Sequence, residues 1–320
     1  MSNHWKASQL QRPSFAPRYW SGWLAVAALW VLGKLPRSWG LLLVAPLGPL
    51  LRLLLAGRRR IAERNLAACL PEKSAAERKH LLRGCFAALA RMLVEMAWSW
   101  NGQPEKLQPM VRMRGQEALR AQRESGRGLL VITAHVTSLE LGACLFGRQF
   151  PGLGIYRPLG NPVLEWYQNR GRRHYASGMI SKRDMLGAVR ALRRGDLVWY
   201  APDQDFGPQQ SLFIPFFGVQ AATLLATHRL PRMTRCDVVT MMPRYVAEEG
   251  IYEVVISPVL EQFPSTDPEA DLARVNALLE AQIREAPEQY WWIHRRFKSR
   301  PEGEPDFYGR DARSAGGDES

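Results

Sequence analysis

Cysteine is scarce in this 320-residue chain, and its spacing excludes two common kinds of small-domain scaffold. The four cysteines are scattered and form no Cys-x-x-Cys pair: Cys69, Cys85, Cys144 and Cys236. Such spacing argues against a structural zinc site and against a dense disulfide framework. We therefore expect reduced thiols in a protein that faces the cytoplasm.

Acidic residues are also in deficit, with 30 Asp and Glu against 43 Lys and Arg, which gives a formal net charge of +13. An excess of this sign favours nucleic acid, an anionic membrane surface, or a phosphorylated or acidic partner, and does not choose among them. The 11 tryptophans add a second indication, because Trp is enriched where proteins meet the membrane interface.

An uninterrupted apolar run long enough to cross a bilayer is missing as well. A spanning helix needs about 20 apolar residues, whereas the two N-terminal apolar runs cover 19–33 and 39–51, and the second contains Pro46 and Pro49. No small-residue cleavage site follows the first run, so a signal peptide is not expected. We expect residues 1–57 to attach the protein to a membrane, by one spanning helix or by a hairpin embedded in one leaflet. A buried pair of core helices is the alternative.

The most informative stretch begins with the apolar run 128–133, which is typical of a buried strand. His135 follows directly, at the carboxyl end of the strand, where open α/β sheets bind their ligands. Glu140 lies five positions later, a rotation of about 140° on one continuous helix. The two side chains can therefore meet only if Glu140 reaches back from the first helical turn, as in a general-base pair. Alternatively, Thr137-x-x-Glu140 is a capping box.

Two more predicted strands, 153–157 and 197–201, also end in polar residues, Arg157 and Asp203. Strands that alternate with helices indicate βαβ units and a largely parallel or mixed sheet. The carboxyl ends of such strands share one edge, so His135, Arg157 and Asp203 are predicted to lie on a common rim.

The remaining segments divide the chain into an N-terminal anchor (1–57), an α/β domain (58–303) and a disordered tail (304–320). Further helices are expected at 61–70, after the capping box Ser74-x-x-Glu77, and at 117–124, 185–194, 223–232 and 269–285, and further strands at 110–114, 237–242 and 252–256. The aromatic segment 212–217 is suited to form an apolar wall of a binding site or to contact a membrane. The basic cluster Arg170, Arg172, Arg173 and His174 fits either phosphate recognition or a solvated helix end.

At this point the residues carry a family resemblance. His135-x-x-x-x-Glu140 resembles the H-x4-D/E motif of membrane glycerolipid acyltransferases, and more narrowly that of the bacterial lipid A late (lauroyl/myristoyl) acyltransferases. The segments that match this family run through most of the chain: 58–65, 156–162, 183–184, 198–208 and 287–303. The Asp203 segment and the ending His294-Arg-Arg-Phe make the match more specific than the His/Glu pair alone.

The resemblance implies an α/β domain with a central mixed β-sheet flanked by helices, behind an N-terminal membrane segment. It further implies an acyltransferase of the bacterial inner membrane whose catalytic domain faces the cytoplasm. The acyl donor would be acyl-acyl carrier protein carrying a laurate- or myristate-like chain. The acceptor would be a hydroxyl on a 3-hydroxyacyl chain of a lipid A precursor. No cofactor, metal or nucleic acid is expected.

Residue roles follow from this resemblance together with general-base chemistry. His135 would take the proton of the acceptor hydroxyl, and Glu140 would hold the imidazole tautomer. An oxyanion could be stabilised by Arg157, by Arg172 or by N–H groups of the helix after His135. The residues predicted to bind substrate are Arg157, Asn161, Arg172, Arg183, Asp203, Gln204 and Asp205.

Two rival functions remain open at the level of sequence. A metal-dependent hydrolase could bind a divalent ion through the carboxylate oxygens of Asp203 and Asp205, with His135, Glu140 and His294 as further candidate ligands. A zinc site is less well supported, because no second histidine lies close to His135 in the sequence. A membrane-tethered protein that binds nucleic acid would suit the charge, but the sequence carries no recognisable binding motif.

Overall fold

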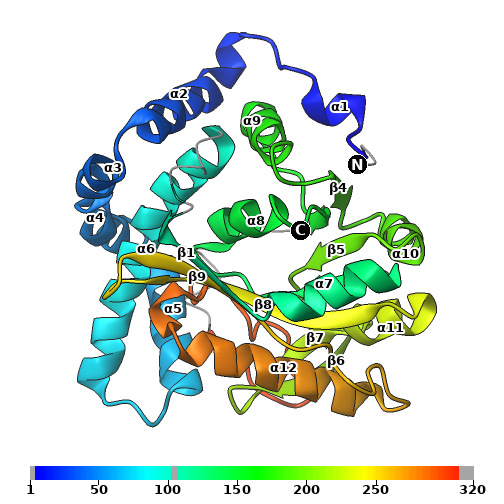
Figure 1. Cartoon of the computed structure of the whole chain (residues 1–320). Helices are drawn as coiled ribbons and strands as arrows, with labels where there is room; N and C mark the ends of the chain where they lie inside the picture. The colour runs from blue at the N-terminus through cyan, green and yellow to red at the C-terminus, as the bar shows by residue number, and fades with distance from the viewer. Residues whose placement is uncertain (1–3, 102–106, 108, 310–320) are drawn as a thin grey trace.

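A seven-stranded mixed sheet runs through the centre of the computed structural model, which describes residues 4–101, 107 and 109–309 (Figure 1). Its strands are β1 (Val111–Arg114), β2 (Leu129–Ile132), β3 (Leu153–Tyr156), β4 (Gly178–Ser181), β5 (Leu197–Tyr200), β8 (Asp237–Val246) and β9 (Ile251–Ile256). The order across the sheet is β1-β9-β8-β2-β5-β3-β4, and only the β8–β9 pair is antiparallel. The predicted α/β fold with a mixed sheet is confirmed.

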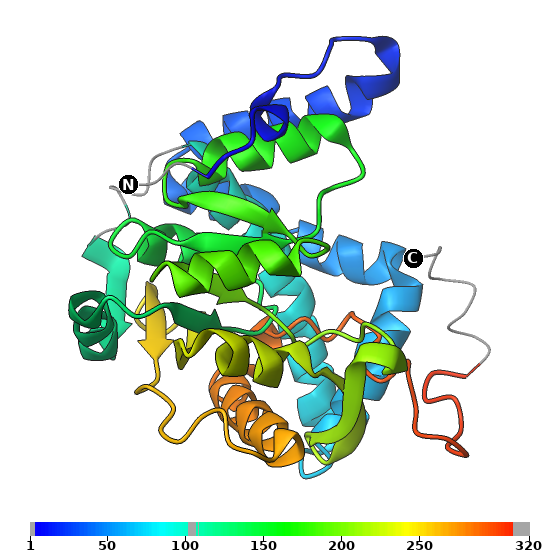
Figure 2. The same ribbon diagram turned by 90° about the vertical axis from the view of Figure 1, so that its right-hand side faces the viewer.

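Helices cover both faces of this sheet. They are α1 (Ala7–Leu10), α2 (Trp20–Lys34), α3 (Arg37–Val44), α4 (Leu47–Leu54), α5 (Ala56–Cys69), α6 (Ala75–Asn101), α7 (Gln116–Ser125), α8 (Leu139–Gly147), α9 (Pro162–Arg172), α10 (Met185–Arg193), α11 (Ala226–Thr234) and α12 (Pro268–Arg284). In Figure 2 the blue N-terminal segment and green α9 lie above the sheet, and orange α12 lies below it.

The alternation of β2 between the two faces fixes the place where the chain leaves the sheet. Leu129 and Val131 belong to the same buried cluster as Phe146 of α8, whereas Leu130 and Ile132 belong to the cluster that includes Leu192 of α10. Successive side chains of a strand point to opposite faces, so a four-residue strand that is wholly buried has helices on both sides. His135 therefore emerges at the edge of the sheet rather than on a face.

The N-terminal helices α2, α3 and α4 pack along the 27-residue helix α6 and leave an apolar face exposed. Large hydrophobic side chains on this face are well exposed, including Trp20, Leu24, Trp30, Val31, Trp39, Leu42, Leu43, Leu50, Leu53, Leu54 and Leu55. The stretch Arg37–Leu54, formed by α3 and α4, is long and apolar enough to cross a membrane, and only 17% of it is buried.

The segment 211–224 differs from the prediction. It forms a β-hairpin of β6 (Ser211–Phe216) and β7 (Val219–Leu224), whose turn residues Phe217 and Gly218 both have positive φ. Two consecutive positive φ angles suit a tight hairpin turn. The predicted helix 223–232 is therefore wrong at its start, because α11 begins only at Ala226. Ile214 and Phe216 are buried while Pro215 is exposed, so this segment packs by strand alternation.

Some of the other local predictions from the sequence agree with the structure and others do not. The Ser74–Glu77 capping box is confirmed, with Ser74 N donating to Glu77 Oε2 at 2.7 Å and Glu77 N donating to Ser74 Oγ at 3.2 Å. The four cysteines are free thiols and all are buried. Strand β4 was not predicted. Tyr308, placed in the predicted tail 304–320, is buried and its hydroxyl donates to Asn65 Oδ1 at 2.7 Å; residues 310–320 of that tail lie outside the described residues.

The close approach of α8 to β8 gives a prediction about stability. A Cβ added at Gly142 would lie 2.2 Å from Cβ and 2.5 Å from Cγ of Pro243, so Gly142→Ala should lower the free energy of unfolding by about 1–3 kcal/mol. Gly160→Ala is the matched control, because a Cβ there meets no atom within 4 Å. Thermal unfolding in detergent would measure both; equal midpoints would contradict the packing argument.

Candidate active site

The backbone around His135 is held by a segment from the far end of the chain. Thr137 N donates to Gln289 O at 2.8 Å, and Trp291 N donates to His135 O at 3.0 Å. An isolated antiparallel bridge pairs Val136 with Tyr290 between these two bonds. The turn after β2 is thus fixed on both sides, which places the imidazole in a defined position.

Asp203, at the end of β5, binds His135 twice. Its Oδ2 accepts from His135 N at 2.9 Å, and its Oδ1 lies 2.6 Å from His135 Nδ1. Strands β2 and β5 are parallel neighbours, so their carboxyl ends meet, as predicted. The carboxylate side chain is 1% exposed and the imidazole 31%. A carboxylate only accepts, so Nδ1 carries the ring proton and Nε2 is left as the basic nitrogen.

The electrostatics of this pair favour the charged state of both partners. Burial works against charge and by itself lowers the pKa of His135, but the Asp203 carboxylate and its hydrogen bond outweigh burial and raise that pKa above its ordinary value. Burial likewise raises the pKa of Asp203 by itself, and His135 brings it below its ordinary value. Burial raises the pKa of the Tyr290 hydroxyl, and the Asp203 carboxylate raises it further. The pair therefore has the geometry of a general base with its orienting carboxylate.

Glu140, the residue expected to orient His135, makes other contacts. It accepts from Arg172 Nε at 2.9 Å and from Arg172 Nη2 at 2.6 Å, from Trp100 Nε1 at 2.7 Å, and from the Tyr175 hydroxyl. The predicted contact with the imidazole is thus wrong. The physical reason is that Glu140 points from α8 toward α6 and α9, where a bidentate Arg partner and two further donors satisfy a buried carboxylate.

The capping-box interpretation of Glu140 fails as well. Ser138 is the N-cap residue of α8 and makes no side-chain capping bond, and within the described part of the chain Thr137 Oγ1 is buried without a hydrogen-bond partner. Burial by itself raises the pKa of Glu140, but the Arg172 guanidinium and the hydrogen bonds hold it below its ordinary value. Glu140 is therefore a charged residue in the wall of the site.

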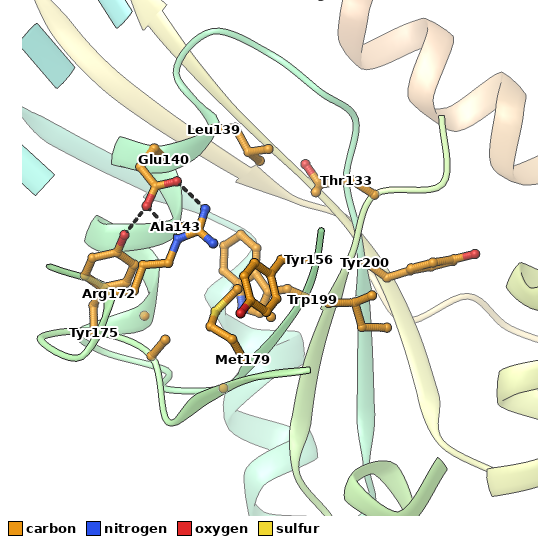
Figure 3. A pocket seen from close by; sticks show the side chains of 16 residues that line it. Thr133, Leu139, Glu140, Ala143, Tyr156, Arg172, Tyr175, Met179, Trp199 and Tyr200 are labelled. Carbon is orange, nitrogen blue, oxygen red and sulfur yellow. Dashed lines mark hydrogen bonds and ion pairs between the residues drawn. The ribbon is translucent and has the colours of Figure 1, made fainter. Parts of the chain in front are cut away.

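An apolar cavity lies on the α8 face of the sheet (Figure 3). The space in it that the centre of a water-sized sphere can occupy is about 110 Å³. The residues that line it are Thr133, Leu139, Glu140, Ala143, Gly147, Gly152, Gly154, Ile155, Tyr156, Arg172, Tyr175, Ala176, Met179, Trp199, Tyr200 and Ala201. Thr133 and Ala201 precede His135 and Asp203 by two residues each, so the cavity borders the ends of the two strands that carry this pair.

The depth of the cavity follows from helix geometry. Leu139 and Gly147 both line it and are eight residues apart on α8, which corresponds to about 12 Å. At the inner end, Met179 lies against Gly154: a Cβ at Gly154 would be 2.8 Å from Met179 Cε and 3.1 Å from its sulfur. A flexible side chain resting on a glycine thus forms the floor of the cavity.

A cluster of cations occupies the same rim of the sheet. Arg157 follows β3, and Lys182 and Arg183 follow β4, its parallel neighbour. Burial lowers the pKa of Lys182, and the positive charges of Arg157 and Arg183 lower it further. Lys182 Nζ also lies 5.5 Å from the centroid of the Phe206 ring, next to the loop that carries Asp203. Like charges held this close favour an anionic partner.

Several predicted substrate ligands have structural partners instead. Asn161 caps α9, its Oδ1 accepting from Val163 N at 2.9 Å and from Leu164 N at 3.2 Å. Asp205 accepts from Ser299 N at 2.6 Å and from Ser299 Oγ at 2.9 Å. Gln204 is partly exposed next to Asp203.

The side chains named for a metal site do not converge. Asp205 is bound to Ser299, and Asp205 N donates to His294 Nε2 at 3.3 Å. In the ranges 4–101, 107 and 109–309, no three His, Cys, Asp or Glu side chains are grouped so that they could hold an ion.

Sequence reasoning missed Trp100 and Tyr175, which donate hydrogen bonds to the buried Glu140 carboxylate, and Tyr290, whose backbone pairs with Val136 next to His135. Trp100 lies 40 residues from Glu140 in the sequence and Tyr175 lies 35 residues from it. The signal that could have indicated them is a polar-tipped aromatic on an otherwise apolar buried segment, since buried Tyr and Trp need hydrogen-bond partners.

Comparison with known proteins agrees with the resemblance. The family model described as bacterial lipid A biosynthesis acyltransferase matches residues 8–299. Relatives from Escherichia coli (strain K12) include a lipid A biosynthesis lauroyltransferase, 39% identical over 91% of this chain and 96% of its own length. A lipid A biosynthesis palmitoleoyltransferase is 36% identical over 94% of this chain and 98% of its own length. A lipid A biosynthesis myristoyltransferase is 31% identical over 92% of each chain.

The matched span contains β2 with His135, β5 with Asp203, and the segment around Tyr290 that holds them. It also contains α2–α4 and their exposed apolar face. On this extent of similarity, the chain belongs to the bacterial lipid A biosynthesis acyltransferases.

Proposed function

We propose that this acyltransferase moves a fatty acyl chain from acyl-acyl carrier protein to the hydroxyl of a 3-hydroxyacyl chain on a lipid A precursor. The observation that carries the proposal is the His135–Asp203 pair, which lies two residues after Thr133 and Ala201 in the lining of an apolar cavity. A basic nitrogen activates a hydroxyl, and an apolar cavity holds an aliphatic chain. The relatives' names, which specify lauroyl, palmitoleoyl and myristoyl groups, support a long-chain donor.

In the proposed reaction, His135 Nε2 accepts the proton of the acceptor hydroxyl while that oxygen attacks the carbonyl carbon of the thioester. The tetrahedral intermediate then expels the thiolate as the carbon–sulfur bond breaks, and the imidazolium returns its proton to the sulfur. One ester replaces one thioester, and no other reagent is consumed. Asp203 holds the tautomer and stabilises the imidazolium.

The developing oxyanion needs donors close to His135. The first N–H groups of a helix have no partner within the helix, and α8 begins at Leu139, directly after the His135 turn. We propose that backbone N–H groups at the start of α8 stabilise the oxyanion. Arg172 is less suited to that role, because its Nε and Nη2 are both engaged by Glu140. Glu140 and Arg172 instead hold the cavity wall in place.

The cation cluster of Arg157, Lys182 and Arg183 suits an anionic partner at the rim. Both substrates supply such a group: the carrier protein is acidic, and the lipid A precursor is phosphorylated. Complementary charge at this edge would raise the rate of encounter and orient the thioester toward the cavity.

The exposed apolar face of α2–α4 is proposed to lie in one leaflet of the inner membrane, with the α/β domain in the cytoplasm. Helix α2 has 15 residues, about 22 Å, which is shorter than a hydrocarbon core of about 30 Å. The longer apolar stretch Arg37–Leu54 is divided between α3 and α4 at Ala45 and Pro46. Both ends of the segment return to the same domain: Trp5 Nε1 donates to Ala176 O at 3.3 Å, and Asn65 Nδ2 donates to Trp292 O at 2.7 Å. Insertion along the interface fits this arrangement better than crossing.

The proposed function is tested with the detergent-solubilised protein, acyl-acyl carrier protein thioesters and an under-acylated lipid A precursor, with products read by mass spectrometry. His135→Ala and Asp203→Asn should each lower kcat by about 10²–10⁴-fold, because the first removes the base and the second its orienting charge. The control is Asp267→Asn at the N-cap of α12, where Asn caps as well as Asp. Wild-type turnover by His135→Ala would refute the mechanism.

The pH dependence follows from the raised pKa of His135. The base must be neutral, so activity should be lost as pH falls through a pKa above the ordinary value of about 6.5. In Asp203→Asn the carboxylate that raises this pKa is gone, so the acidic limb of log kcat should move to lower pH while the plateau falls. A pH profile of both proteins measures this. An acidic limb at the same pH in both would show that Asp203 does not act on the imidazole.

The position of Met179 in the cavity predicts which acyl chain length the enzyme prefers in its donor. Met179→Ala removes the side chain that lies against Gly154 and should deepen the cavity, shifting the ratio of longer to shorter acyl chains by about tenfold. Competition among thioesters of different chain length gives the ratio from one reaction. Met233→Ala, at a half-exposed methionine on α11, is the control. An unchanged ratio would place the acyl chain elsewhere.

A further inference from the structure

Helices α2 and α9 lie side by side (Figure 1). A second apolar groove lies between them, outside the site described above. Its main walls are Trp20, Leu24, Ala27 and Trp30 of α2 and Trp166 and Tyr167 of α9. Trp20, Leu24 and Trp30 are among the exposed hydrophobic residues of the N-terminal face. The groove is therefore continuous with the surface that we place in the membrane, and a bilayer chain can enter it without crossing polar surface.

Two guanidinium groups lie against tryptophan rings that line this groove. The Arg12 guanidinium lies 5.1 Å from the Trp23 ring centroid and 5.9 Å from that of Trp166, and the Arg170 guanidinium lies 5.8 Å from the Trp166 centroid. Among the residues that the structure describes, neither arginine has an ion pair with a carboxylate. Two positive charges gathered on one indole repel each other unless an anion joins them, and planar guanidiniums suit phosphate.

The groove is closed off from the catalytic cavity by α9 and the end of α6. Trp100 packs edge-on against Tyr167, with ring centroids 5.9 Å apart. The Tyr167 hydroxyl donates to Asn101 Oδ1 at 2.8 Å, and Trp100 Nε1 donates to Glu140 on the cavity side. Arg170 therefore lines the groove, whereas Arg172, two residues later, lines the catalytic cavity. A chain in the groove would not reach His135.

We infer that the groove binds an anionic glycerophospholipid of the surrounding bilayer, with one acyl chain along α2 and α9 and the phosphate between Arg12 and Arg170. The aromatic lining supplies apolar contact and the two cations supply the charge that selects an anionic headgroup. A bilayer lipid is favoured over the acceptor substrate because the wall of Trp100 and Tyr167 separates the groove from the base. This inference stands independently of the proposed reaction.

The test is retention of lipid by the full chain in detergent, measured by native mass spectrometry after incubation with phosphatidylglycerol or phosphatidylcholine at equal concentration. The wild type should retain phosphatidylglycerol in preference. The double variant Arg12→Gln/Arg170→Gln should lower that retention by about fivefold for each guanidinium and leave phosphatidylcholine unchanged. Arg18→Gln/Arg173→Gln is the control, because it removes the same charge from the same two segments outside the groove.

A second pair of variants tests whether the apolar lining of the groove contributes to lipid binding. Ala27→Trp should fill the groove and lower retention of both lipids, whereas Val31→Trp, on the exposed face of α2 but outside the groove lining, should not. Circular dichroism confirms that each variant is folded. The inference is overturned if both double variants retain phosphatidylglycerol equally or if Ala27→Trp and Val31→Trp behave alike. It is also overturned if an added lipid A precursor displaces phosphatidylglycerol mole for mole.

Discussion

A carboxylate buried from water, Asp203, is the constraint on which the site depends. Its side chain is 1% exposed, and a charge in such a place is tolerated only when donors surround it. The donors are the backbone N–H and the ring of His135, which follow β2. The need to satisfy one carboxylate thus aligns the ends of β2 and β5, and backbone hydrogen bonds from the segment 289–291 hold the His135 turn in place.

A second buried carboxylate, Glu140, organises the other side of the cavity. It joins three helices, since Trp100 belongs to α6, Arg172 ends α9, and Glu140 lies in the first turn of α8. Because Trp100, Arg172 and Tyr175 all donate to this one group, loss of any one would leave a buried charge undersolvated. Helix α9 is consequently held as a fixed partition, with the catalytic cavity on one side and the aromatic groove on the other.

The exposed apolar helices and the cavity lie in positions that suit the proposed reaction. Both aliphatic groups that the proposed reaction joins are insoluble in water, and the long helix α6 connects the exposed apolar face to the wall that carries Trp100. The cations Arg157, Lys182 and Arg183 lie on the sheet rim next to the Asp203 loop, where water can reach them. Apolar and anionic parts of the substrates therefore find complementary surfaces around one base.

What the sequence by itself determined is local. The buried run before His135, the strand ends at Arg157 and Asp203, and the Ser74–Glu77 capping box depend on residues within a few positions of each other, and the structure agrees with each. The tertiary structure decided the partners. His135 pairs with a residue 68 positions away and Glu140 with residues 32 to 40 positions away. Periodicity carries no information about which strand lies beside which, because that order is set by packing of whole elements.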